Sequence, residues 1–129
     1  ESLVEGRRLV FRLRANPTKR AGKSDATHSG KRVDLRGEKE RLEWLRRRGR
    51  NGGFDLVGFD FDPAVPRVRV NPEPPLHGRK RGGRLTFGSA LFEGLLRITD
   101  AEAFRRTVQR GLGSAKAYGF GLLSLAAPR

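Results

Sequence analysis

The sequence contains no cysteine and no methionine among its 129 residues. Without cysteine, the chain forms no disulfide bonds and performs no thiolate chemistry. Its apolar runs are too short for a transmembrane helix, and its first residues lack the basic and apolar regions of a secretory signal. We therefore expect a cytoplasmic chain without a membrane partner. Because no initiator methionine is present, we also expect a fragment or a processed chain.

Acidic residues are scarce relative to basic ones, 14 against 28, and the formal net charge is +14 at pH 7. Such an excess is unfavourable on one compact surface unless a polyanion offsets it. Most of the basic residues are arginine, which binds phosphate through paired hydrogen bonds and stacks on bases. The charge is spread through patterned segments rather than gathered in a tail. Nucleic acid is therefore the expected partner, in preference to an anionic membrane surface.

The first predicted strand covers residues 7–14 and alternates in polarity. Leu9, Phe11 and Leu13 face one way, and mainly arginines face the other, as in a strand buried on one side. Residues 16–34 are polar, basic and rich in small side chains, which indicates a long flexible loop.

A helix is predicted over residues 37–49, because glutamates occupy its first turn and arginines its last, as the helix dipole favours. Leu42 and Leu45 mark its buried side, and Trp44 is expected to pack with them. The Asn-Gly-Gly sequence at 51–53 ends the helix.

A second helix is predicted over residues 100–110. Thr99 and Glu102 have the spacing of a capping box at its start. Phe104 and Val108 lie one turn apart and are expected to point inward.

Further strands are predicted at residues 54–61, 65–71, 84–98 and 119–126. In the second of these, Arg67 and Arg69 share one face. The third is either one long strand or two strands broken near Gly88 or Gly94. Residues 71–83 are rich in proline and glycine, and we expect them to form a flexible basic connection in a hairpin.

The element order is therefore β-α-β-β-α-β, which predicts an α+β, ferredoxin-like (RRM-like) fold. We expect an antiparallel sheet with two helices on one face and an extended basic hairpin. Residues 1–129 form one domain, in which 16–34 and 71–83 are flexible basic loops. This fold hosts many functions and does not by itself assign one.

The segment GLGSAKAYGFGLL contains four glycines, Gly111, Gly113, Gly119 and Gly121. It is not a dinucleotide-binding fingerprint, because Lys116 stands where a third glycine is needed and the segment follows a helix. A glycine-rich loop with free N–H groups lets phosphates approach the backbone closely. A helix cap followed by a tight turn explains the same glycines. Lys116 and the basic chain favour contact with nucleic acid.

The two histidines, His28 and His77, are predicted in loops without the spacing of metal ligands, so we expect no metal and no cofactor. A solvated loop histidine is commoner than a catalytic one. Tyr118 has two interpretations, since it can stack on a base or pack under the glycine-rich loop.

Four segments resemble the C-terminal half of the CasE family in the same order: residues 8–20, 38–48, 89–100 and 111–128. CasE proteins are the CRISPR RNA-processing endoribonucleases of the type I-E Cascade complex. The terminal loop is similar to the glycine-rich motif of the wider RAMP superfamily. The resemblance implies that this loop packs between two ferredoxin-like domains and helps bind precursor CRISPR RNA. It implies as partners the CRISPR repeat RNA hairpin and the other Cascade subunits.

The resemblance places the catalytic histidine and tyrosine of the family in an N-terminal domain. This chain begins where the second domain begins, so we expect the catalytic domain to be absent. His28, His77 and Tyr118 do not lie in segments that match the catalytic helix, and no catalytic residue is assigned. The family cleaves without metal by activating a ribose 2′-OH. Whether this chain is itself an enzyme stays open at this point.

The resemblance further suggests that the hairpin at residues 66–84 grips the repeat stem-loop. A two-stranded ribbon that carries arginines can follow phosphates along a groove, although the A-form major groove is deep and narrow. A solvated charged hairpin is the alternative. The predicted RNA-binding residues are Arg12, Arg14, Lys19, Arg20, Arg67, Arg69, Arg79, Lys80, Arg81, Arg84 and Lys116.

Two other functions are compatible with the fold. In an RRM-like RNA-binding module, Phe59 and Phe61 would stand for the aromatic residues of the central strands, but the full RNP sequence pattern is missing. A ribosomal or ribonucleoprotein assembly protein is the other alternative, and the terminal glycine motif argues against it.

Overall fold

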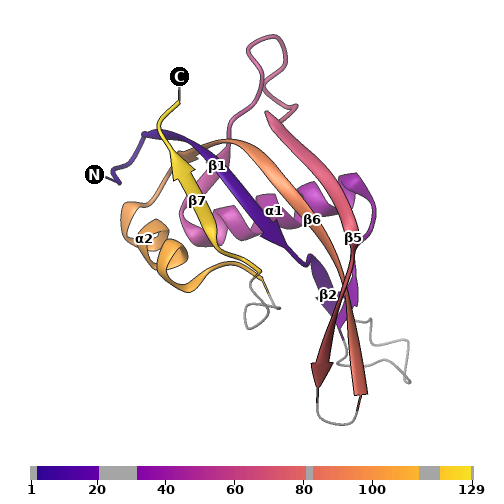
Figure 1. Cartoon of the computed structure of the whole chain (residues 1–129). Coiled ribbons are helices and arrows are strands. Elements are labelled where there is room, and N and C mark those ends of the chain that lie inside the picture. Colours follow the sequence, from indigo (N-terminus) through magenta and orange to yellow (C-terminus); the bar gives the residue numbers. More distant parts are fainter. Residues whose placement is uncertain (1–2, 21–31, 81–82, 114–119, 129) are drawn as a thin grey trace.

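A computed structural model describes residues 3–20, 32–80, 83–113 and 120–128 (Figure 1). The elements along the chain are β1 (Arg8–Ala15), β2 (Thr18–Arg20), β3 (Arg32–Asp34), α1 (Glu38–Gly52), β4 (Phe54–Leu56), β5 (Val68–Lys80), β6 (Gly83–Ile98), α2 (Ala101–Arg110) and β7 (Leu123–Ala126).

The main sheet is antiparallel and has the order β4-β6-β1-β7, with β5 also paired to β6. Strands β4 and β5 pair with successive stretches of β6, so together they form one interrupted edge strand. The chain leaves the sheet at Val57, whose N–H donates to Leu95 O (3.0 Å), and rejoins it at Arg67, whose carbonyl accepts the Leu95 N–H (3.1 Å). The arrangement confirms the predicted α+β, ferredoxin-like fold.

The core lies between one face of the sheet and the two helices. On β1, Leu9, Phe11 and Leu13 are buried and alternate with exposed residues, as the sequence pattern predicts. Trp44 of α1 and Phe104 of α2 are buried in the same core, and α1 crosses behind the sheet in Figure 1. Each such apolar side chain contributes about 1.5–3 kcal/mol on burial. Among the residues that the structure describes, no helix covers the opposite face of the sheet, which we call the open face.

Helix α1 ends at Gly52, three residues later than predicted. Gly53 stops it by adopting the left-handed conformation (φ 89°) and donating its N–H to Gly49 O. Its buried side also differs from the prediction, because Arg41 is buried and Leu42 is only half-buried. Arg41 Nε donates to Leu35 O (2.9 Å), and burial lowers the pKa of this guanidinium.

Helix α2 begins at Ala101, one residue later than predicted, and has a different cap. Asp100 is the N-cap, and its carboxylate accepts the N–H of Ala103 (3.0 Å). The capping box predicted from Thr99 and Glu102 is therefore wrong. Gly111 follows the helix as expected, and its N–H donates to Thr107 O.

Both predicted basic loops contain strands. In the 16–34 segment, Thr18–Arg20 pairs with Arg32–Asp34 in a small two-stranded sheet. Most of the 71–83 segment belongs to β5, which runs to Lys80. Pro72 and Pro74 are tolerated because β5 is an edge strand, where a missing N–H costs little. His77 accordingly lies on a strand opposite Thr86 rather than in a loop.

The remaining strand boundaries differ in length. The strand predicted at 54–61 ends at Leu56, and the one predicted at 119–126 begins at Leu123. The 84–98 segment is one continuous strand, β6. Gly94 does not break it, because residues on both sides remain paired with β1. A Cβ at this position would lie 2.2 Å from Arg67 O, and only glycine allows this close approach.

Candidate nucleic-acid interface

A two-stranded ribbon made by the ends of β5 and β6 extends beyond the helices (Figure 1). The pairing is continuous except for an irregularity between Glu73 and Leu76. At its end Arg79 lies opposite Arg84, and Lys80 lies opposite Gly83. Like charges at opposite positions weaken an antiparallel ladder. The structure thus places three of the predicted RNA-binding residues together on one arm, and Arg81 lies outside the described residues.

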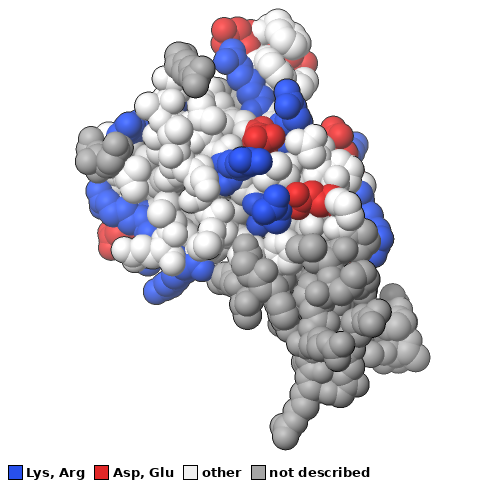
Figure 2. All heavy atoms as spheres, viewed as in Figure 1, with Lys and Arg blue, Asp and Glu red and all other residues white. Residues whose placement is uncertain are grey.

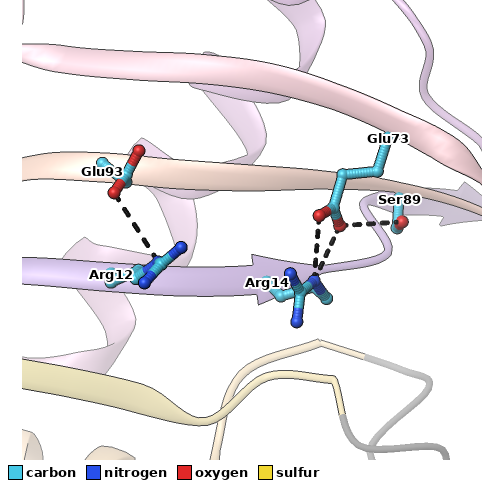
Figure 3. Close-up of polar contacts among 5 residues, drawn as sticks. All are labelled: Arg12, Arg14, Glu73, Ser89 and Glu93. Atoms are coloured by element: carbon cyan, nitrogen blue, oxygen red, sulfur yellow. Dashed lines mark hydrogen bonds and ion pairs between the residues drawn. The ribbon is translucent and has the colours of Figure 1, made fainter.

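Arg12 and Arg14 lie on the open face of the sheet, as predicted, but both are paired with carboxylates (Figure 3). Arg14 Nε donates to Glu73 Oε1 (2.8 Å) and Oε2 (3.1 Å). Arg12 Nε lies 3.6 Å from Glu93 Oε2. The buried Ser89 donates its hydroxyl to Glu73 (3.3 Å), which holds this carboxylate in place.

These pairs moderate the charge that the open face offers. Hydrogen bonding and charge attraction from Glu73 raise the pKa of Arg14, so its guanidinium remains charged. Figure 2 shows blue arginines beside red carboxylates over this face. Exposed ion pairs are worth about 0–1 kcal/mol, so a phosphate can displace the carboxylate.

Arg67 and Arg69 line one hollow of about 430 Å³ on the open side of the sheet. Arg69 is exposed and lies opposite Glu93 of β6. Arg67 lies just before β5, with its guanidinium 5.6 Å from the ring centre of Phe59 and 3.2 Å from Asp60. The structure therefore brings the two arginines together, as predicted, although Arg67 lies outside the strand.

Lys19 and Arg20 lie on β2, beside the base of the ribbon. The Gly88 N–H of β6 donates to Asp34 Oδ2 of β3 (3.0 Å), and Asn16 Nδ2 donates to Asp34 Oδ1 (3.1 Å) and to the Gly88 carbonyl. These bonds tie the small sheet to β6. The Lys19 side chain is exposed.

The described ends of the glycine-rich loop are used in packing. Leu112 N–H donates to Gly121 O, and Gly121 N–H donates to Arg14 O, both at 2.8 Å. Gly113 and Gly121 have φ of 91°, and a side chain on Gly121 would lie 2.2 Å from Leu112 O. The N–H groups of Leu112 and Gly121 are therefore not free for a phosphate. Gly119 and Lys116 lie outside the described residues.

A further group of arginines was not singled out from the sequence. Arg46 and Arg50 of α1 and Arg97 of β6 line one hollow of about 260 Å³, with Asp55 of β4. Arginines at the end of a helix are explained by the helix dipole alone. No sequence pattern identifies this group, because Asp55 of β4 lies beside the arginines of α1 only after the chain has folded.

The candidate catalytic and metal-binding groups gain no support from the geometry. His28 and Tyr118 lie outside the described residues. Within the part of the chain that is described, no group of three histidines or acidic residues is placed to hold a metal ion. Among the same residues, no helix has the length and apolar character needed to span a membrane.

Comparison with known proteins decides the family. The model of the family described as "CRISPR associated protein" matches residues 1–127. The chain belongs to this family. The chain is 40% identical over 128 residues to the CRISPR-associated endoribonuclease Cse3 of Thermus thermophilus, covering 97% of this chain. It is 36% identical over 124 residues to the CRISPR system Cascade subunit CasE of Escherichia coli, covering 92% of this chain. The predicted resemblance to CasE is confirmed.

The structural comparison agrees. The structure of Cse3 bound to a 19-nucleotide RNA matches with a TM-score of 0.83 and 41% identity, covering 96% of this chain and 58% of that one. The chain spans 58% of the Thermus protein's length and 57% of the Escherichia coli protein's length. The family is thus established over nearly the whole chain. The endoribonuclease activity named for the Thermus relative is that of a longer protein.

Proposed function

We propose that this chain binds a CRISPR repeat RNA hairpin as the RNA-holding part of a CRISPR RNA-processing endoribonuclease. In this proposal it works as a subunit of a Cascade complex in the cytoplasm. The observation that carries the proposal is the ribbon of β5 and β6, which places Arg79, Lys80 and Arg84 together beyond the helices.

Two further observations support it. The net charge of +14 favours a polyanionic ligand. The relatives point the same way, since one is an endoribonuclease with bound RNA and another is a Cascade subunit. An RRM-like module would bind through aromatic residues on its open sheet face. On β1 that face presents Arg8, Val10, Arg12 and Arg14 instead.

The proposal predicts tight, salt-dependent binding of a repeat hairpin. Each neutralised phosphate releases condensed counterions, so log affinity should fall linearly with log salt concentration. The measurement is a fluorescence anisotropy titration of a labelled hairpin at several salt concentrations. Absence of binding at low salt, or affinity independent of salt, would contradict the proposal.

A further inference from the structure

A groove follows the edge of the sheet where β4 and β5 are separated. It consists of three adjoining hollows of about 260, 390 and 430 Å³. Asp55, Leu56 and Arg97 line both the first and the second, and Phe59 lines both the second and the third. We call this continuous depression the edge groove. It runs from the last turns of α1, over β4, to the start of β5.

The edge groove carries an excess of positive charge. Its carboxylates are engaged, since Asp55 pairs with Arg97 (3.5 Å), Asp60 with Arg67 (3.2 Å) and Glu93 with Arg12 (3.6 Å). Three exposed arginines have no ion-pair partner among the residues that the structure describes. They are Arg50 in the first hollow, Arg8 in the second and Arg69 in the third. Cationic groups thus occur along the whole length of the groove.

Phe59 lines the middle of the groove, and the ring of Phe61, which lines none of the three hollows, lies against it. Phe61 is 83% exposed, and its ring stacks on that of Phe59, with centres 5.0 Å apart and planes at 24°. The loop that carries them is built by hydrogen bonds: Asp62 accepts the Ala64 N–H (3.1 Å), and Phe59 N–H donates to Val65 O (3.0 Å). The loop therefore presents a large apolar ring to solvent in a defined position.

We propose that a single-stranded segment of RNA lies along the edge groove. Its phosphates contact Arg8, Arg50 and Arg69, and one of its bases stacks on Phe61. Proteins that bind single-stranded nucleic acid combine a positive groove with aromatic rings in this way. A duplex does not fit the same chemistry, because its bases are stacked on each other and offer no free face. The inference rests on the proposed RNA-binding function but assigns a surface other than the ribbon.

The test compares two RNAs in binding titrations with the full chain. One is a repeat hairpin without flanks, and the other carries an added single-stranded tail of about ten uridines, a length within the range of known single-strand sites. The tail should raise affinity for the unaltered protein. Phe61→Ala should remove about fivefold or more of this gain, whereas Phe61→Tyr, which keeps a stacking ring, should retain it. The tail should also steepen the fall of log affinity with log salt concentration. Arg50→Gln should reduce this added slope by roughly 0.7, the value for one phosphate contact on a single strand.

Matched controls separate the groove from general effects. Leu122→Ala removes an exposed apolar side chain (63% exposed) beside β7, and Arg110→Gln removes a charge at the end of α2. Neither should change the gain from the tail. A hairpin that does not bind at all contradicts the proposed function instead. A hairpin that binds while the tail adds nothing, or adds as much to Phe61→Ala as to the unaltered protein, overturns the proposal for the edge groove.

Discussion

Single carboxylates set how much positive charge the open face offers to a ligand. Glu73 holds Arg14 by two contacts from one guanidinium nitrogen, and Ser89 fixes the carboxylate from the other side. A bound phosphate must displace or share these contacts. We therefore expect Glu73 to lower the affinity of this face for RNA while it keeps Arg14 in one place.

Glu73→Gln should raise RNA affinity by about two- to fivefold, because it removes a negative charge near the ligand and releases Arg14 from an exposed pair. The measurement is a hairpin titration at low salt. Glu102→Gln is the matched control, since it breaks an exposed pair with Arg106 on α2 (3.4 Å). A loss of affinity in Glu73→Gln would mean that the ion pair positions Arg14 for its ligand.

Asp100 has a purely structural role at the same scale. Asp100→Ala should destabilise the protein by about 1 kcal/mol, because the Ala103 N–H loses its acceptor at the start of α2. Urea denaturation followed by circular dichroism measures the change. Asp100→Asn keeps a good capping side chain and should stay within a few tenths of a kcal/mol of the unaltered protein. Equal loss in both variants would point to charge rather than capping.

At the scale of elements, the alternation of β1, the charge distribution along the helices and the glycines that end α1 made the fold predictable. Leu9, Phe11 and Leu13 are buried because a strand exposes every second residue to each face. Local rules failed where a distant contact decides. Arg41 takes the buried position expected of Leu42 because the Leu35 carbonyl lies within its reach, and no sequence pattern encodes that contact.

The composition of residues 71–83 was a poor guide to their structure. Proline and glycine indicate a loop, but here β6 supplies a continuous partner from Gly83 onward. Tertiary pairing overrides local preference in sheets. The sequence predicted that the basic hairpin binds RNA. It did not predict that the two strands stay paired as far as Lys80 and Gly83.

The ribbon itself carries a prediction. Changing Arg79, Lys80 and Arg81 together to alanine should weaken hairpin binding at least tenfold and reduce its salt dependence, because phosphate contacts are lost. Thermal unfolding should be nearly unchanged, since exposed charges contribute little to stability. The triple variant Arg47→Ala, Arg106→Ala, Arg110→Ala removes the same charge from the helices and serves as control. Equal losses in the two triple variants would attribute binding to net charge alone.

At the scale of the whole molecule, the sequence predicts the fold and the family, but it does not predict which arginines form ion pairs with carboxylates. Arg12 and Arg14 were predicted on the open face and lie there, but their pairing with Glu93 and Glu73 depends on strand register across β6 and β5. Register is fixed by long-range pairing, which residue spacing does not reveal. The arginines around Asp55 were missed for the same reason.

The 129-residue chain should not cleave repeat RNA. Metal-independent cleavage needs a base near the 2′-OH and an acid near the leaving oxygen, each within hydrogen-bond reach. The chain has two histidines, and His77 lies on the ribbon, opposite Thr86. The assay incubates the chain with a repeat hairpin in EDTA and resolves the products on a gel. A single cut that disappears in His28→Ala or His77→Ala would place an active site in this chain.

Prolines in β5 also decide what the ribbon does not bind. An exposed edge strand of this length is a template on which the strand of another molecule can add and start aggregation. Pro72 and Pro74 have no N–H, so an added strand cannot form a continuous ladder along this stretch. We therefore expect copies of the protein not to join edge to edge along this stretch of β5. The exposed edge of the ribbon is then not used up by strand addition and is left for a ligand of another kind.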